Sequence, residues 1–206
     1  MFEAITYNLM LENIQENELV EDTIGILFAR PKSSAGRGII ESLPYYHHRS
    51  GYAINFYLPG YGAYWHGVYP DETNVVKIND IQWSFSNQKY AEFVADIEKN
   101  SQWKYSGESE LMLVEYRNRM LDFSNVLRFN LDAMLRDKAI PSINVLLENL
   151  FREATKRKNV TQISDISGAK TLGQVTVESI LGVLPDFFCG LIKQERHYIV
   201  KDYSKI

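Results

Sequence analysis

The stretch YYHHRSGYAINFYLPGYGAYWHG, residues 45–67, holds three of the four histidines and eight of the 26 aromatic residues of the chain. Residues 52–58 alternate between the two faces of an extended strand. One face holds Tyr52, Ile54, Phe56 and Leu58, and the other holds Ala53, Asn55 and Tyr57. Pro59-Gly60 then favours a tight turn, because proline presets its φ and glycine accepts a positive one. We therefore predict that residues 61–69 return as an antiparallel strand, with one apolar and one tyrosine-rich face.

The rest of the first 85 residues predicts further strands and turns. Residues 23–28 (TIGILF) form a short apolar run with β-branched members, which is typical of a buried strand. Residues 74–78 follow an acidic turn and form a third strand candidate. Residues 30–38 (RPKSSAGRG) are rich in chain-breaking residues, so we predict a loop there.

From Ser86 onward the hydrophobic period becomes that of a helix. Ser86 is a suitable N-cap for a helix over residues 87–99, and Ser142 for a second helix whose apolar stripe reaches Ala154. A further helix is predicted over 171–184. The apolar spacing of residues 121–136 matches a helix over a longer stretch than a strand, so we favour a helix. Residues 110–116 and 197–203 predict returning strands.

Together these elements predict an α+β fold in a single domain spanning residues 1–206. An antiparallel, β-rich N-terminal lobe (about 1–85) precedes a mainly helical lobe (about 86–206) that packs on the sheet. A chain of 206 residues is long enough to bury a core of its own.

Composition narrows the functional classes. The formal net charge of −4 opposes general nucleic-acid binding, which needs excess cations to displace counterions from phosphates. Cys189 is the only cysteine, which excludes an internal disulfide and a Cys-rich zinc site, and its apolar surroundings favour a buried, inert thiol. No apolar run approaches the ~20 residues of a membrane span. We therefore expect a soluble, cytoplasmic protein without a cofactor.

The histidines do not have metal-ligand spacing. His47 and His48 are adjacent, so an extended chain points them to opposite faces, and His66 lies far along the sequence. No His-x-x-x-His pair occurs. We predict no metal site.

Two basic segments leave phosphate or nucleic-acid binding open as an alternative. Residues 32–38 could cradle a phosphate through backbone N–H groups, although they lack the order of a P-loop. Residues 152–158 end a predicted helix, where cations complement the helix dipole without any partner. We favour a solvated loop and a structural helix end.

One set of residues points toward an enzyme. Arg49 precedes the Ser84-Phe85-Ser86 motif, and Glu108-Ser109-Glu110 follows it. A carboxylate can stabilise an oxocarbenium-like centre, and an arginine fork can hold a diphosphate. This order resembles that of mono-ADP-ribosyltransferases. The resemblance implies a nucleotide-dependent enzyme in which Arg49 holds nicotinamide dinucleotide and Ser84 braces the pocket. Glu108 and Glu110 would then form the Glu-x-Glu turn, and Glu110 would stabilise the sugar cation. The helix predicted between the serines and the glutamates departs from that family's strand-rich core.

The tyrosine-rich face is the stronger functional signal, because tyrosine and tryptophan are enriched at the centres of protein interfaces. We expect Tyr57, Tyr64, Trp65 and His66 to form the docking surface of a non-catalytic protein-interaction module. Its partner is another protein or a second copy of the chain, within a cytoplasmic assembly of bacterial type. A stacking surface for a base or sugar, or simple packing beneath the helices, are the alternatives.

Overall fold

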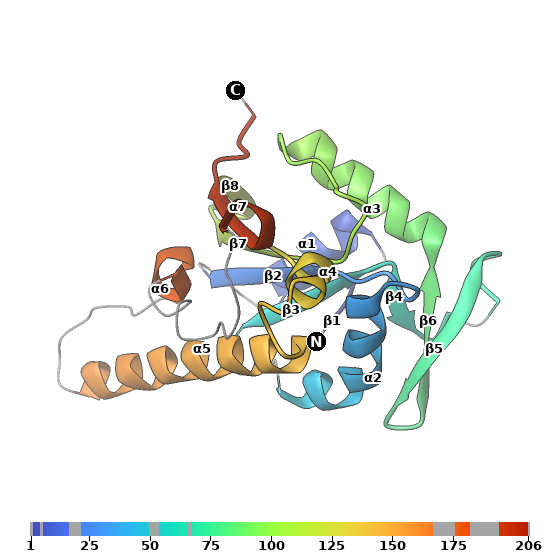
Figure 1. Cartoon of the computed structure of the whole chain (residues 1–206), viewed down its shortest axis with the longest axis horizontal. Helices are drawn as coiled ribbons and strands as arrows, with labels where there is room; N and C mark the ends of the chain where they lie inside the picture. Colours follow the sequence, from blue (N-terminus) through green and yellow to red (C-terminus); the bar gives the residue numbers. More distant parts are fainter. Residues whose placement is uncertain are drawn as a thin grey trace.

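A six-stranded mixed sheet forms the centre of the computed structural model (Figure 1). In spatial order its strands are β1 (Phe2–Ala4), β3 (Asn55–Pro59), β2 (Asp22–Phe28), β7 (Glu110–Arg117), β8 (Met120–Asn130) and β9 (Tyr198–Lys201). β1, β3 and β2 are parallel, whereas β2–β7, β7–β8 and β8–β9 are antiparallel pairs. The structure describes residues 2–4, 6–16, 22–49, 54–65, 67–166, 176–181 and 194–205.

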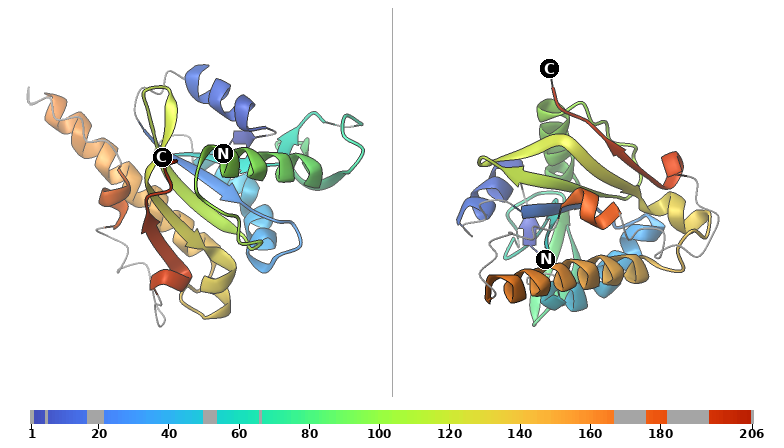
Figure 2. Two further views of the ribbon diagram at one scale, coloured as in Figure 1. Left: turned by 90° about the horizontal axis from the view of Figure 1, so that it is seen from above. Right: turned by 90° about the vertical axis from the view of Figure 1, so that its left-hand side faces the viewer.

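Helices cover both faces of this sheet (Figure 2). One layer contains α1 (Tyr7–Glu16) and α3 (Asn87–Asn100), and the other contains α2 (Ser34–Arg49) and α5 (Ile143–Ile166). Consecutive residues of β3 contact opposite layers. Phe56 packs edge-on against Phe151 of α5, and the Tyr57 hydroxyl donates to Asn13 Oδ1 of α1 at 2.9 Å. The central strands are therefore buried on both sides.

A smaller sheet extends beside the first one (Figure 1). Its antiparallel strands lie in the order β4 (Tyr61–Ala63), β6 (Ile81–Ser86) and β5 (Glu72–Ile78). The inner face buries Tyr61, Trp83 and Phe85 in the common core. The register pairs Gly62 with Ser84 and Ser84 with Asn74, so these residues belong to the outer face.

Three short helices complete the described chain. They are α4 (Leu131–Arg136), α6 (Val177–Leu181) and α7 (Gln194–His197). None of the helices in the described ranges combines the length and the apolar composition of a membrane span.

The α+β class and most locally encoded elements are confirmed. Ser86 caps α3, where its Oγ accepts the Lys89 backbone N–H at 3.1 Å. Strands occupy the predicted positions in β2, β5, β7 and β9, and α5 begins at Ile143 directly after Ser142. α6 covers part of the helix predicted over 171–184, and the remainder of that segment lies outside the described residues.

The predicted pairing of residues 52–58 with residues 61–69 is wrong. β3 lies between β1 and β2, whereas β4 pairs with β6 of the smaller sheet. The chain changes sheets at Gly60, whose φ of 76° and close approach to Tyr90 suit glycine alone. Alternation could not reveal this, because a strand buried on both faces has no polar side to define its partner.

The predicted loop over residues 30–38 is also wrong from Ser34 onward, where α2 begins. Gly36 and Gly38 resemble chain breakers, yet Ile39, Leu43 and Tyr46 form a buried helical stripe. The helix also tolerates Pro44 within it. The N-terminal lobe therefore contains two helices and parallel strands, in contrast to the purely antiparallel lobe that was expected.

Residues 121–130 form strand β8, which overturns the helix favoured for the first part of 121–136. The ladder with β7 shifts register between Leu113 and Glu115. The shift places extra residues of β8 opposite Val114 and interrupts its alternation. The buried residues Val126 and Leu127 therefore follow the buried Phe123 at intervals of three and four positions, which is the spacing expected of a helix.

Two glycines of α2 provide a test of this packing. A Cβ atom on Gly36 would lie 1.8 Å from the Arg30 carbonyl oxygen, whereas a Cβ on Gly38 would meet nothing within 4 Å. We expect Gly36→Ala to lower the free energy of unfolding by about 2 kcal/mol or more, and Gly38→Ala to raise it by about 0.5–1 kcal/mol. Urea titration of both variants measures the two signs, and an equal response would contradict the close approach at Gly36.

Candidate functional site

The four predicted docking residues do not share one exposed face. Tyr57 is fully buried under α1, so the prediction that it lies on an exposed face is wrong. The strand alternation did not reveal this because β3 is buried on both of its faces. Trp65 is 4% exposed, and His66 lies outside the described residues. Tyr64 is 79% exposed, which makes it the member of the set that a partner could reach directly.

Trp65 folds over the outer face of the smaller sheet. Its ring lies against Gly62, where an added Cβ would come within 2.3 Å of ring atoms. An edge contact of 5.2 Å between ring centres joins it to Tyr69. Its Nε1 atom is buried and has no hydrogen-bond partner among the described residues. The packing of Trp65 against Gly62 and Tyr69 holds the backbone of the adjacent residue Tyr64 in place.

A hollow of about 340 Å³ opens on the outer face, beside Tyr64. Its wall includes Tyr64, Trp65, Asn74, Asp80, Gln82 and Ser84. Ser84 Oγ donates to Asn74 Oδ1 at 3.2 Å, and Gln82 Nε2 donates to the Val76 and Trp83 carbonyls. Sequence reasoning missed Asn74, Asp80 and Gln82. The polar alternation of residues 74, 82 and 84 was the signal that could have found them, once β5 and β6 were known to pair.

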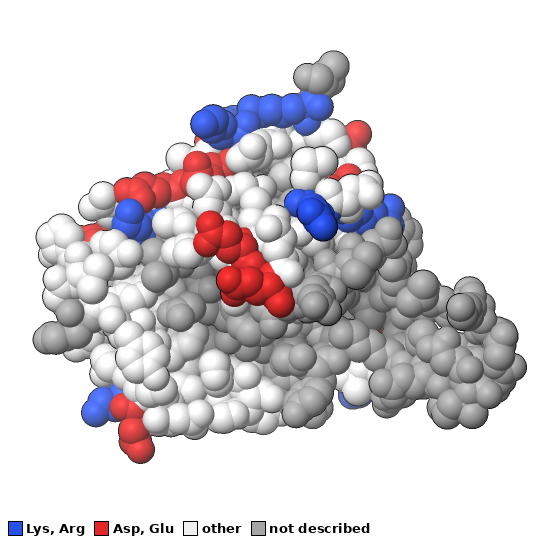
Figure 3. Space-filling view, turned by 180° about the vertical axis from the view of Figure 1, so that it is seen from behind, with Lys and Arg blue, Asp and Glu red and all other residues white. Residues whose placement is uncertain are grey.

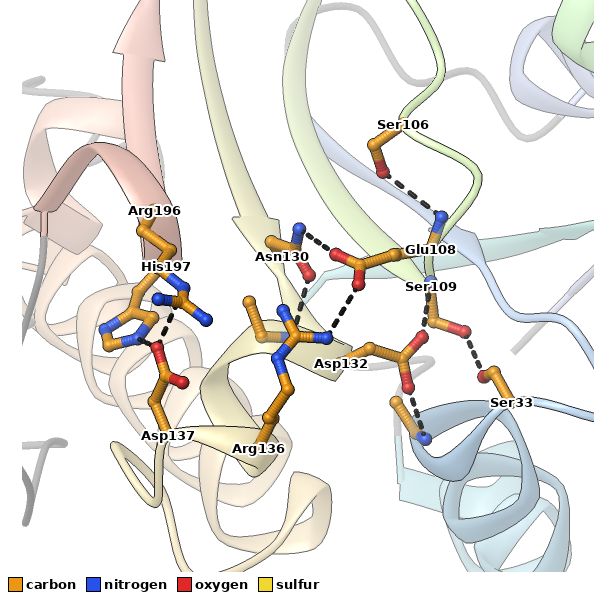
Figure 4. Close-up of polar contacts among 12 residues, drawn as sticks. Ser33, Ser106, Glu108, Ser109, Asn130, Asp132, Arg136, Asp137, Arg196 and His197 are labelled. Atoms are coloured by element: carbon orange, nitrogen blue, oxygen red, sulfur yellow. Dashed lines mark hydrogen bonds and ion pairs between the residues drawn. The ribbon is translucent and has the colours of Figure 1, made fainter.

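Glu108 is engaged with its own chain (Figure 4). Asn130 Nδ2 donates to its Oε2 at 2.5 Å, and Arg136 Nη1 donates to its Oε1 at 2.9 Å. These hydrogen bonds hold the pKa of the Glu108 carboxyl below its usual range, and the bond from Arg136 has the largest effect. The contacts tie the start of β7 to the end of β8 and to α4, which is a structural arrangement.

Glu110 lies two residues further on and is fully buried. Its carboxylate accepts from Trp103 Nε1 at 3.3 Å and from the Ser106 backbone N–H at 3.2 Å, with Arg128 Nη1 at 3.8 Å. Burial raises the pKa of the Glu110 carboxyl above its usual range, against the opposing effect of these donors. A carboxylate enclosed in this way does not contact a bound sugar without rearrangement of the core.

The other members of the enzyme-like set lie elsewhere. Ser84 belongs to the smaller sheet, whereas Glu108 and Glu110 flank the start of a strand in the larger one. Arg49 ends α2, and its side chain lies outside the described part. In the described structure the two glutamates therefore have separate partners at the start of β7, and Ser84 lies on a different sheet.

The histidines have separate structural partners. His47 and His48 lie on helix α2 with ring centres 5.6 Å apart, which corrects the extended conformation assumed for them. His48 Nε2 is 3.2 Å from Asn79 Oδ1, and the buried His197 contacts Asp137 Oδ2 at 2.8 Å (Figure 4). Within the described residues, no group of three His, Cys, Asp or Glu side chains is placed to hold a metal ion.

Charges of both signs occur on the surface, and the acidic ones gather over α1 and α3 on the face seen in Figure 3. Residues 152–158 lie within α5, which continues to Ile166, so the prediction that this basic segment ends a helix is wrong. The side chains of residues 156–158 lie outside the described part, as does Cys189, and the roles predicted for these side chains stay predictions.

Comparisons of the chain with protein-family models, with curated proteins and with solved structures found no match.

The opposite pKa directions of Glu110 and Glu108 predict opposite pH dependences. The raised folded-state pKa of Glu110 means that its stabilising contribution is complete below its ordinary value of 4.5 and is lost as pH rises through the folded-state value. We therefore expect the stability of Glu110→Gln relative to wild type to increase from about pH 4 to pH 8. Urea titrations across this range measure the difference, and any offset at low pH reports the altered hydrogen bonds.

Glu108→Gln is the matched control. The lowered pKa of Glu108 stabilises the folded state above the ordinary value of 4.5, and this contribution is lost as pH falls through the folded-state value. The relative stability of Glu108→Gln should therefore decrease from acid to neutral pH. Parallel slopes for the two variants would contradict the environments assigned to these carboxyls.

Proposed function

We propose that the chain is a non-catalytic module that binds a partner protein through the outer face of the smaller sheet. The observation that carries this proposal is the presentation of Tyr64. It combines a φ of 62° with 79% exposure at the edge of the outer hollow. The proposal keeps the docking role expected from the tyrosine-rich segment but moves it from the β3 face to the face formed by β4, β6 and β5.

The backbone of Tyr64 supports a role in recognition. A bulky residue in the left-handed region is an uncommon conformation that costs about 1–2 kcal/mol. Strained backbone conformations of this kind cluster at ligand-binding positions, where the strain holds a side chain in the orientation that binding needs. Val68, in the same segment between β4 and β5, is 60% exposed. The segment between β4 and β5 thus exposes two large side chains, of which Tyr64 borders the hollow.

The polar floor of the hollow supports a protein partner. Within the described residues, the Asn74 amide nitrogen and the Gln82 amide oxygen make no hydrogen bond, so both remain able to bind a peptide group. An aromatic anchor beside amide donors and acceptors is the arrangement found at the centres of protein interfaces. The hollow contains one acid, Asp80, and no described cation in its wall, so recognition through strong charge is not required.

The engagement of Glu108 and Glu110 supports the non-catalytic part of the proposal. Glu108 is held by Arg136 and Asn130, and Glu110 is enclosed beside Trp103. Both carboxylates have structural partners that account for their positions. The enzyme alternative would require these contacts to open when a nucleotide binds.

Site-specific photo-crosslinking tests the docking face. A benzoylphenylalanine at position 64 should capture one protein, either a partner or a second copy of the chain, that the same probe at position 45 does not capture. Tyr45 is a matched control because it is 53% exposed and lies on α2. With the purified partner, Tyr64→Ala should weaken binding by about tenfold or more, and Tyr45→Ala should leave it unchanged. Identical captures at both positions, or unchanged affinity of Tyr64→Ala, would refute the proposal.

Tyr64→Gly separates binding from folding. Glycine adopts a positive φ without steric cost, so we expect the free energy of unfolding to rise by about 0.5–1 kcal/mol while partner binding falls as in Tyr64→Ala. Urea titration and the binding assay measure the two effects. A variant that is both less stable and less able to bind would indicate that Tyr64 has a packing role instead.

A further inference from the structure

A second hollow, of about 310 Å³, opens between the smaller sheet and the loop that follows β2. Its wall includes Arg30, Lys32, Asp71, Thr73, Phe85 and Asn87. Thr73 and Phe85 are cross-strand partners, so they share the face opposite to Asn74 and Ser84. The hollow is therefore separate from the one beside Tyr64 and is independent of the proposed docking function.

The position of this hollow suits a small ligand. Arg30 and Lys32 follow the carboxyl end of β2, a strand of the parallel set β1-β3-β2. The chain leaves β1 for α1 in one helical layer and leaves β2 for α2 in the opposite layer (Figure 2). β3 lies between these two strands, and open sheets with parallel strands bind ligands outside the carboxyl ends of their strands.

Arg30 is positioned by aromatic rings. Its guanidinium carbon lies 5.3 Å from the ring centre of Tyr90 and 5.7 Å from that of Tyr105. A hydrogen bond of 2.7 Å joins the two tyrosine hydroxyls and fixes the pair. Within the described residues, Arg30 forms no ion pair, so its charge is oriented but is not neutralised by a carboxylate.

The loop that carries Arg30 is anchored by a serine and aspartate network (Figure 4). The Ser33 and Ser109 hydroxyls are 2.7 Å apart, and Ser109 N donates to Asp132 Oδ2 at 2.7 Å. Ala35 N donates to Asp132 Oδ1, and Gly36 N donates to Ser33 Oγ. These bonds occupy backbone N–H groups of the segment that could have cradled a phosphate. An anion here would be bound by side-chain cations of a preorganised loop.

Lys32 supplies the second cation. It is exposed, and it makes no ion pair among the described residues. Asp71 is the acid of the hollow, but both of its oxygens are engaged at the start of α3. Its Oδ1 accepts from Ser86 Oγ at 2.7 Å, and its Oδ2 accepts from Gln88 N at 2.8 Å. The hollow thus presents two cations that lack carboxylate partners against one carboxylate that is already hydrogen-bonded.

We propose that this hollow binds a phosphomonoester of a small organic molecule. Arg30 presents paired N–H groups to two phosphoryl oxygens, and Lys32 adds a point charge, a combination that suits a dianion. Phe85 offers an apolar contact to the organic part, and Asn87 offers an amide. The volume lies at the lower end of the range for small-molecule pockets, which limits the ligand to about the size of a sugar phosphate or a mononucleotide.

Isothermal titration of the full chain with inorganic phosphate, ribose 5-phosphate and adenosine 5′-monophosphate tests the site. We expect at least one ester to bind more tightly than inorganic phosphate. Arg30→Met should weaken that binding by about tenfold or more, and Lys32→Met by about threefold to tenfold. Lys77→Met is the control, because it removes an exposed lysine of β5 that lies outside the hollow.

Circular dichroism and melting curves establish that each variant is folded. Lys32→Glu keeps the test decisive if Arg30→Met unfolds, because Lys32 is exposed. The proposal is overturned if none of the three compounds binds wild type at about 10 mM, if both cation variants bind like wild type, or if acetate binds as well as phosphate. Tighter binding of a single-stranded oligonucleotide than of its monomer, through the same two cations, would also overturn it by indicating a nucleic-acid ligand.

Discussion

The Asp132 carboxylate joins three parts of the chain that are distant in sequence, and the arrangement of the hollow beside Arg30 depends on it. One oxygen accepts the Ala35 N–H at the start of α2, and the other accepts the Ser109 N–H before β7. An acid at the first turn of a helix also complements the helix dipole. Because Ser109 in turn contacts Ser33, the β2–α2 loop is held against the larger sheet. The direction of that loop decides where Arg30 points, and the wall of the inner hollow follows from it.

The smaller sheet offers two chemically different surfaces from the same pair of strands. Thr73 and Phe85 on its inner face border two cations, whereas Asn74 and Ser84 on its outer face border an exposed tyrosine. Strand alternation makes this possible, since adjacent residues of β5 and β6 point to opposite sides. A charged small ligand and a protein partner would thus bind on opposite faces of one three-stranded sheet.

Elements held by contacts between residues close in sequence were predicted correctly, whereas elements that depend on contacts between distant residues were not. The helix after Ser86 was predictable because its cap and its apolar stripe lie within fifteen consecutive positions, and the local bond to Lys89 confirms it. β8 was missed because the register shift opposite Val114 distorts its spacing, and such a shift exists only once β7 is paired. α2 was missed because Gly36 serves a contact with the Arg30 carbonyl, and that contact is not visible in the composition of the segment. Tyr57 was assigned to the wrong environment for a related reason, since the second helical layer that covers it comes from α1 and α3.

By itself, the sequence determined the α+β class, the strands β2, β5 and β7, and the capped helices α3 and α5, because hydrophobic period and caps act over a few residues. It also singled out Tyr64 within an aromatic segment, but it placed Tyr64 on a face shared by β3 and β4, which in fact belong to different sheets. Only the tertiary structure decided that β3 and β4 join different sheets, that Trp65 is seated on Gly62, and that Arg30 lies against Tyr90 and Tyr105. The strand pairs and the contacts of Arg30 join residues far apart in the chain, and the seat of Trp65 on Gly62 depends on the turn between them. Their free energy comes from burial and from paired polar groups that no short stretch of sequence contains.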